Sequence, residues 1–191
     1  MCIRDSRQIQ AQMDQKREKY HRVRSNYETM RNMAERYDGY GNSIRKVMAN
    51  KDKNPGLIGV VADIIKVDKE YEIAIETALG GNIQNIVTED EATAKKMIAF
   101  LKQNRFGRAT FLPLSAIQVR NTLEGEPCMK EKGVIGAASD LVRVSFEYEK
   151  LAKYLLGRIL VVDNIDNALA IARKYRHSLR IVTLEGEQLN P

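Results

Sequence analysis

The sequence has few of the residues that usually mark a metal site, a disulfide framework or a catalytic centre. Its 191 residues include two cysteines and two histidines. Cys2 and Cys128 stand in no metal-ligand or redox spacing, which fits a reducing compartment and argues against a disulfide-stapled fold. His21 and His177 have no serine or cysteine placed by the sequence to form a nucleophile and base pair. We therefore expect no metal, no cofactor and no catalytic residue in this chain.

Long apolar segments and phosphate-binding motifs are also missing. No apolar run approaches the roughly 20 residues that a membrane span needs, and no signal-peptide pattern opens the chain. There is no GxxxxGK[ST] motif, and no GxGxxG follows a strand pattern. These absences predict a cytoplasmic chain that neither enters a membrane nor hydrolyses nucleotides by itself.

Charge is unevenly distributed along the chain, which has a net charge of +6. Residues 1–55 carry 13 lysines and arginines against 7 acidic residues, whereas residues 56–191 carry 18 of each. The whole basic surplus therefore belongs to the N-terminal segment. Such a surplus attracts polyanions, including nucleic acid, and the alternative interpretation is a solvated helix face.

Residues 1–50 are predicted to form a projecting coiled-coil arm. A seven-residue apolar repeat can be held in one register as far as Ile44 and Met48, and Gly39 and Gly41 weaken the helix before that end. Ahead of the break the helix would extend on the order of 45 Å, too long to fold into a small core. The seam of the arm consists of Met13, Tyr20, Val23, Tyr27, Met30, Ala34 and Tyr37.

An internal repeat dominates the remainder of the chain. The segments 56–80 and 133–157 align without a gap at an offset of 77 residues and share ten identical positions. We interpret the repeat as a duplication that produced two related halves. Its glycine and aspartate pairs are Gly56 and Gly133, Gly59 and Gly136, Asp63 and Asp140, and Gly80 and Gly157.

The paired aspartates allow two interpretations. Asp63 and Asp140 could serve as carboxylates for acid-base chemistry, or each could cap a neighbouring helix in its own half. Their matching places in the repeat favour the structural role. The repeated glycines are expected to permit close backbone approach or strand bulges.

In the first half, apolar patterns predict strands over residues 57–67, 83–87 and 108–112, the last stopped by Pro113. Asp68 is the expected N-cap of the first helix, which Gly80 and Gly81 end. Residues 88–91 have capping-box spacing and should open a second helix that buries Ala94, Ile98 and Leu101.

The second half repeats this plan. Strands are predicted over residues 134–144, 159–162 and 180–184, with one helix ending at Leu156 and another around Ile171. The fold class is therefore α/β with mixed sheets, in two pseudo-repeated subdomains at 56–114 and 133–191. Residues 115–132 contain Gly125, Pro127 and several charges, and we predict a linker there.

Exposed cations supply a candidate surface for nucleic acid. Because they are spread over predicted helix faces, they could meet phosphates without reading a base sequence, and the alternative is again a set of solvated helix faces. The candidate DNA-binding residues are Lys95, Lys96, Lys102, Arg105 and Arg108, with Arg45 and Lys46 at the root of the arm.

Several segments together resemble the hinge of bacterial structural-maintenance-of-chromosomes (SMC) proteins. The resemblance rests on GLIGVVADIIKV, YEIAIETALGGNIQNIV, FLKQNRFGRATFLPL, GVIGAASDLV and RIVTLEGEQLNP. It covers about residues 40–191, and the arm is similar to the ascending coiled coil of that family.

The resemblance implies a two-subdomain hinge that joins two SMC chains as a homodimer, contacts DNA and serves chromosome condensation and segregation at the nucleoid. ATPase heads would lie outside these residues. It also implies that the family pattern continues past Pro191 into a glycine-rich interface segment and a descending coiled-coil helix, so that the second subdomain is truncated here. A DNA-binding module without dimerisation, and a small-molecule-binding α/β domain, are the alternative functions.

Overall fold

The computed structural model describes Met13, Lys16 and residues 40–191. Met13 is 60% exposed. The other predicted seam residues lie outside the described residues: Tyr20, Val23, Tyr27, Met30, Ala34 and Tyr37.

The first half contains a three-stranded sheet with the order β1-β3-β4, in which β1 is antiparallel and β4 parallel to β3. Its strands are β1 (Leu57–Val60), β3 (Ile86–Thr88) and β4 (Phe111–Pro113). Its helices are α2 (Asn42–Met48), α3 (Val61–Ile64), α4 (Glu72–Leu79) and α5 (Glu91–Gln103).

The second half has the same arrangement with one further strand, in the order β5-β7-β8-β9. Its strands are β5 (Val134–Ala137), β7 (Ile159–Val162), β8 (Arg180–Thr183) and β9 (Gln188–Leu189). Its helices are α6 (Glu149–Leu156) and α7 (Ile165–Lys174). The short strands β2 (Lys66–Val67) and β6 (Val142–Arg143) pair antiparallel and join the two halves.

Structural equivalence follows the sequence repeat closely. Strands β1 and β5, and helices α4 and α6, begin and end at positions 77 residues apart. The pairing of β1 with β3 shifts register between Leu57 and Gly59, and the pairing of β5 with β7 shifts between Val134 and Gly136. The two repeated glycines therefore follow matching irregularities in the two sheets.

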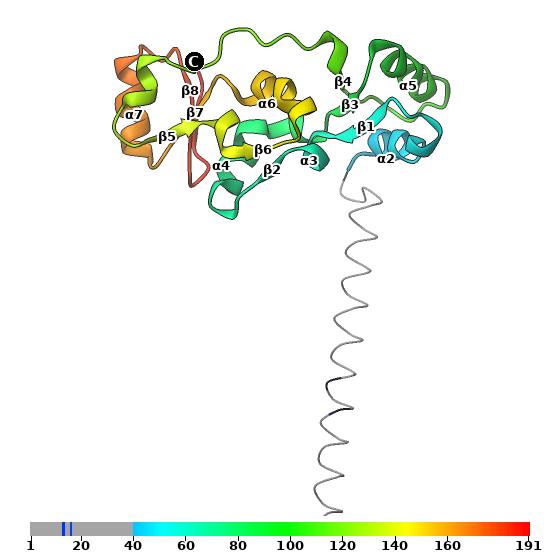
Figure 1. Ribbon diagram of the computed structural model, residues 1–191, viewed down its shortest axis with the longest axis horizontal. Coiled ribbons are helices and arrows are strands. Elements are labelled where there is room, and N and C mark those ends of the chain that lie inside the picture. The colour runs from blue at the N-terminus through cyan, green and yellow to red at the C-terminus, as the bar shows by residue number, and fades with distance from the viewer. Residues whose placement is uncertain (1–12, 14–15, 17–39) are drawn as a thin grey trace, which may run out of the picture.

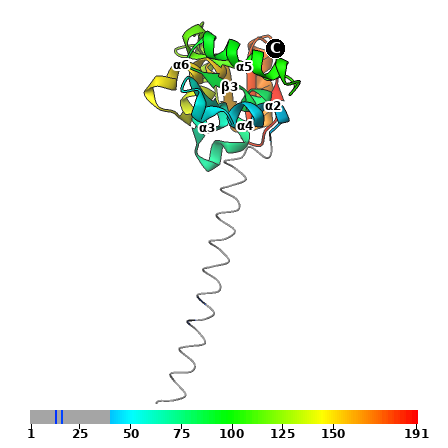
Figure 2. The ribbon, with the colours of Figure 1, turned by 90° about the vertical axis from the view of Figure 1, so that its right-hand side faces the viewer.

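The two sheets lie at opposite ends of the folded part, with α4 and α6 between them (Figure 1). Helices α2 and α5 cover the outer face of the first sheet, and α7 covers the outer face of the second (Figure 1). The end view in Figure 2 has α2 and α5 toward the reader.

Three apolar clusters fill the spaces between these layers, and adjacent strand residues belong to different clusters. On β3, Ile86 packs in the outer cluster with α2 and α5, whereas Val87 packs in the central cluster with α4 and α6. On β7, Leu160 and Val161 divide in the same way between the outer cluster under α7 and the central one. Because successive side chains of a strand point to opposite faces, sheets buried on both faces need continuous apolar runs.

The end of the predicted arm belongs to the globular part. The heptad register placed Ile44 and Met48 on the coiled-coil seam, but both are buried against the first sheet and α5. Helix α2 begins after Gly41, where the two glycines predicted a break. The apolar stripe of α2 is therefore used for core packing.

Neither of the long predicted strands, 57–67 and 134–144, is continuous. The first is interrupted by α3 and the second by a 3-10 turn, Ala138–Leu141. In the first half the carboxylate of Asp63 accepts a hydrogen bond from the Val60 N–H at 3.2 Å. The Val61 N–H donates to Asn85 C=O, which closes the helical turn against the chain before β3. Local side-chain bonding thus overrides the apolar pattern.

Two predicted helix caps were wrong. Asp68 precedes a 3-10 turn, Lys69–Tyr71, makes no side-chain cap and instead pairs with Arg143 across β2 and β6. Thr88 lies inside β3, and the N-cap of α5 is Asp90, whose Oδ1 accepts from the Thr93 N–H at 2.7 Å. Hydrogen bonds from Thr93 hold the pKa of Asp90 below its usual value.

The buried face of α5 also differs from the prediction. Ala94 and Leu101 are buried as expected, but Met97 occupies the core and Ile98 is 50% exposed. The strand predicted over 108–112 is shorter and displaced, since β4 includes Pro113 as its last residue. Proline is tolerated there because β4 is an edge strand among the described residues.

The third predicted strand of the first half, 83–87, begins late because residues 80–84 form a 3-10 turn, Gly80–Gln84. Residues 115–132 pass over α6 between the halves (Figure 1). This segment is anchored to the second half, where Leu123 and Cys128 are buried and the Leu123 N–H donates to Gly157 C=O at 2.9 Å.

Candidate nucleic-acid interface

Three of the predicted DNA-binding residues meet at the C-terminal end of α5. Lys102, Arg105 and Arg108 line one open cavity of about 620 Å³. Its other lining residues are Ile98, Leu101, Gly107 and Ala109. We call this the α5 cleft. It combines an apolar floor with a rim of three cations.

The turn after α5 sets the direction of the two arginines. Arg105 adopts a left-handed backbone with φ 54°, and the Phe106 N–H donates to Leu101 C=O at 3.1 Å, which closes the helix end. Gly107 follows with φ 97°, a conformation that favours glycine. The chain therefore reverses within a few residues and returns Arg108 to the same side as Lys102.

Helix α2 fixes this turn from the other side. The Ser43 hydroxyl donates to Arg108 C=O at 2.7 Å. The Phe106 ring lies against Phe100, with centroids 5.6 Å apart, and the Lys46 ammonium sits 5.3 Å from the Phe106 centroid. The cleft is thus held by packed side chains and a hydrogen bond, while its cationic ends remain exposed.

The remaining predicted cations do not line the α5 cleft. Lys96 lines a different hollow of about 450 Å³ with Asn50 and Phe100, and Lys95 is exposed elsewhere on α5. Lys46 is engaged with Phe106, and Arg45 lies in the last turn of α2. The predicted set therefore divides into one cluster of three and four separate residues.

Electrostatics at the α5 cleft suit an anionic ligand. Its lining includes no acidic residue. Cations at a helix C-terminus also interact favourably with the helix dipole, so Lys102 contributes to the stability of α5 as well. Arginine can contact a phosphate with two parallel hydrogen bonds, whereas lysine acts as a point charge.

The repeated aspartates do not form a paired site. The carboxylate of Asp63, in α3, accepts a hydrogen bond from the Val60 N–H. The carboxylate of Asp140 accepts one from the Ser139 hydroxyl at 3.1 Å. Gly80 and Gly157 follow equivalent helices but differ in backbone, since only Gly80 has a positive φ, of 51°. These contacts give the two aspartates local structural roles of different kinds.

The one cysteine among residues 40–191, Cys128, is buried and free. Burial, followed by the charge of Glu126, raises the pKa of the Cys128 thiol, which disfavours the reactive thiolate. Burial also raises the pKa of Tyr40, and Asp63 adds to that shift. Across the described residues no three His, Cys, Asp or Glu side chains group as a metal site would require. Among the same residues, no helix has the length and apolar character to cross a membrane.

Sequence reasoning missed the apolar members of the α5 cleft. Ile98 was expected in the core, and Phe106 and Ser43, which hold the turn beside the cleft, carried no signal of their own. A cleft of this kind depends on how α2 meets the turn after α5, and the residues that join them, Ser43 and Arg108, are 65 positions apart in the chain. The clustering of basic residues around Gly107 was the one signal available in the sequence.

The chain matches known proteins along most of its length. Residues 54–172 match the family model described as the flexible hinge domain of SMC proteins. The chain is 37% identical over 98% of its length to the chromosome partition protein Smc of Desulfitobacterium hafniense, and 38% identical over 88% to that of Bacillus subtilis. It spans only 15% and 14% of those two proteins.

Solved structures give the same result. A crystal structure of an asymmetric dimer of the Geobacillus stearothermophilus SMC hinge domain matches with a TM-score of 0.85 at 33% identity, covering 97% of this chain and 76% of that one. The Pyrococcus furiosus SMC hinge domain matches with a TM-score of 0.65 at 32% identity, covering 80% and 78%.

Proposed function

Because the chain belongs to the SMC family as its flexible hinge domain, we propose that it joins two SMC chains as a homodimeric hinge and contacts DNA beside the joint. The observation that carries the dimer proposal is a difference at the two sheet edges. Among the described residues, β4 pairs with β3 alone, whereas its equivalent, β8, is paired on both sides by β7 and β9.

An unpaired edge offers backbone donors and acceptors to another chain. In the β3 and β4 register Ile86 faces Phe111, and the Ile86 N–H donates to Thr110 C=O. The opposite side of β4 has no strand neighbour within the described part of the chain. In a dimer with a twofold axis, the β4 edge of each copy would make the same contact with the other copy. Two such equivalent contacts would close the two chains into a ring.

The related Geobacillus hinge domain was crystallised as a dimer, which supports the same assembly here. The α5 cleft lies directly before β4 in the chain, so DNA bound there would run close to the joint. Chromosome partition is the role named for the curated relatives. We extend that role to this chain, with ATPase heads outside residues 1–191 and a cytoplasmic location at the nucleoid.

Sedimentation equilibrium of the chain and of the variant Thr110→Lys tests the dimer. Thr110 is exposed beside the edge of β4, and a lysine there should oppose strand addition. We expect the wild type to dimerise and Thr110→Lys to weaken the dimer by about tenfold or more, a loss of about 1.4 kcal/mol. The control, Gln84→Lys, adds the same charge at an exposed site outside the sheets.

A wild-type chain that stays monomeric at micromolar concentration would contradict the proposal. Equal weakening by both lysine variants would assign the effect to net charge and remove the β4 edge from the interface.

A further inference from the structure

A groove of about 310 Å³ follows the whole length of helix α4. One wall consists of α4 residues with the i, i+3, i+4 and i+7 spacing of a single helix face: Glu72, Ile75, Glu76 and Leu79. The opposite wall, from α3, β2 and the turns beside them, consists of Ala62, Ile65, Val67 and Ile83. In Figure 1, α3, β2 and α4 lie along the lower edge of the folded part and residues 115–132 along its upper edge. We call this cavity the α4 groove.

The floor of the α4 groove is apolar and belongs to the central cluster. Ile65, Ile75 and Leu79 are buried members of that cluster, and the half-buried Val67 and Ile83 pack against it. An apolar side chain placed in the groove would therefore extend the core outward. The volume is near the lower end of the range of about 300–1,000 Å³ found for binding pockets, which suits the side chains along one face of a peptide.

Two carboxylates stand at the rim of the α4 groove. Glu72 and Glu76 are exposed, and the lining of the groove includes no lysine or arginine. Within residues 40–191 neither glutamate forms an ion pair or a side-chain hydrogen bond. Because like charges four residues apart on a helix repel each other, this pair destabilises α4 unless a cation approaches it.

The equivalent helix of the second half lacks this repulsion. At the offset of 77 residues, Glu72 and Glu76 of α4 correspond to Glu149 and Lys153 of α6. A glutamate four residues before a lysine is the favourable order of charges on a helix. The unfavourable pair is therefore a departure of the first half from the repeat, and it lies at the edge of an apolar groove.

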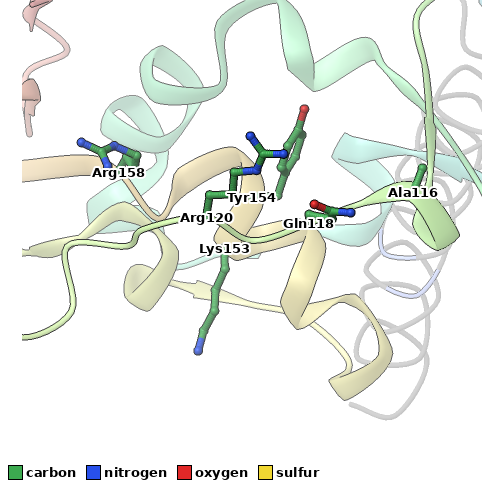
Figure 3. Close-up of a pocket in the computed structure, with 6 residues that line it drawn as sticks. All are labelled: Ala116, Gln118, Arg120, Lys153, Tyr154 and Arg158. Carbon is green, nitrogen blue, oxygen red and sulfur yellow. The ribbon is translucent and has the colours of Figure 1, made fainter.

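Charge of the opposite sign surrounds α6. A cavity of about 610 Å³ beside this helix is lined by Ala116, Gln118, Arg120, Lys153, Tyr154 and Arg158. Figure 3 shows Arg120 and Gln118 beside Tyr154, whereas the Lys153 side chain extends away from them. Three cations and no acidic residue line this cavity. The two middle helices, although related by the repeat, therefore present surfaces that attract different ligands.

We propose that the α4 groove binds a basic amphipathic helix of a partner protein, with apolar side chains on its floor and lysines or arginines on Glu72 and Glu76. Charge complementarity selects a cationic partner, because the rim offers two carboxylates and no cation. The stripe along α4 fits a helix lying in a groove, which binds through anchors at i, i+3, i+4 and i+7. The groove shares no residue with the α5 cleft or β4, so the partner can bind a chain that is dimeric and holds DNA.

Methyl NMR of the full chain with labelled isoleucine side chains tests the proposal. The probe is the synthetic peptide LKKLLKLLKKLLKL, which is cationic and amphipathic as a helix, and the charge control is the same peptide with glutamate at every lysine. We expect the lysine peptide to shift the methyl signals of Ile65, Ile75 and Ile83, which line the groove, and to leave those of Ile171 and Ile181, in the outer cluster of the second half, unchanged. The glutamate peptide should shift none of them.

Two variants change the groove in different ways. Glu76→Lys introduces the residue that the second half has, and it should weaken peptide binding by about tenfold. Because it removes a like-charge pair, it should not lower stability in urea, which separates lost binding from lost folding. Ala62→Met fills the groove without a change of charge and should also weaken binding. The matched control, Glu124→Lys, makes the same change of charge at an exposed site in residues 115–132 and should bind like the wild type.

Several results would overturn the α4 groove as a docking site. They are groove methyls that do not respond to the lysine peptide, a response undiminished in both Glu76→Lys and Ala62→Met, and equal weakening by Glu124→Lys, which would assign binding to net charge. Equal binding of the glutamate peptide would overturn the charge complementarity. Groove methyls that shift with the concentration of the chain alone would assign the groove to a second copy and overturn the partner protein.

Discussion

The two halves of the molecule are related by the internal sequence repeat, and they differ around β4 and α6. Both have an antiparallel strand, a middle helix and a parallel pair of strands, with a register shift at the same place. In the second half β9 covers the outer strand, and in the first half the equivalent chain leaves β4 and crosses α6. One divergence therefore creates both an open sheet edge and an open cavity. The strands and helices that both halves share follow from the duplication, whereas the candidate sites lie where the two halves differ.

The largest expected effect concerns whether the halves are independent. Leu79 and Leu156 end the equivalent helices α4 and α6, and both are buried in the central cluster shared by the two halves. Leu79→Ala and Leu156→Ala should each lower the free energy of unfolding by about 2–5 kcal/mol. Because the cluster is shared, each should speed amide exchange in β3 and in β7 alike.

Hydrogen exchange measured by mass spectrometry would follow both strands at once, with Ile98→Ala as a control at a half-exposed site. If Leu79→Ala accelerates exchange in β3 only, the halves are separate folding units and the shared core is not cooperative.

A smaller effect should distinguish two glycines that the sequence aligns. Gly133 has φ +84°, and a Cβ atom there would lie 2.5 Å from Asp163 Oδ1 and also meet Asn167. Gly56 has no left-handed backbone, and the three atoms nearest to its Cβ would all belong to Thr93, with the hydroxyl at 2.5 Å. We expect Gly133→Ala to cost about 2–4 kcal/mol and Gly56→Ala about 1–3 kcal/mol, since the first adds backbone strain to crowding.

Urea unfolding of the two variants provides the comparison. Equal destabilisation by the two variants would contradict this prediction. It would mean that Thr93 resists displacement as strongly as Asp163 and Asn167 do, and that the positive φ of Gly133 adds no strain to the alanine variant.

The smallest effect distinguishes the helix caps. Asp90 and Asn164 occupy equivalent N-caps, and each accepts a backbone N–H three residues ahead, at 2.7 and 3.0 Å. The folded pKa of Asp90 is lowered, so its stabilising contribution is present above the unfolded pKa of about 3.9 and is lost as the pH falls through the folded value. The Asn164 cap does not titrate.

Acidification below about pH 4 should therefore weaken the Asp90 cap at the start of α5, whereas the Asn164 cap of α7 has no charge to lose. Amide exchange at Thr93 and Asn167, followed by NMR against pH, measures both caps in one sample. Asp90→Asn should abolish the difference, and a difference that persists in this variant would show that another group titrates near α5.

Predictions from sequence succeeded where a local pattern has one outcome. The strand 159–162 and the helix around Ile171 are where the apolar pattern placed them. The DNA-binding role of the seven candidate cations stays a prediction, and three of them line the α5 cleft. Prediction failed where a polar side chain bonded the backbone within an apolar run, as Asp63 does in the strand predicted over 57–67. It also failed in deciding which residues of α5 face the core, since Ile98 is half-exposed. The heptad assignment of Ile44 failed because a stripe of apolar residues suits a core as well as a coiled coil.

The sequence by itself determined the duplication, the alternation of strands and helices, and the resemblance to SMC hinges, because these depend on the order and spacing of residues along the chain. The tertiary structure decided which equivalent contacts are closed and which are open. Gly186 packs on Thr77 of α4, whereas Ala116 and Tyr154 of α6 line an open cavity, although the strand register makes Ala116 equivalent to Gly186 and the repeat aligns Thr77 with Tyr154. That outcome depends on the path of the chain after β4, which is set by side chains from both halves meeting in one core. Such contacts join residues that are far apart in the sequence, so no single segment of the chain specifies them.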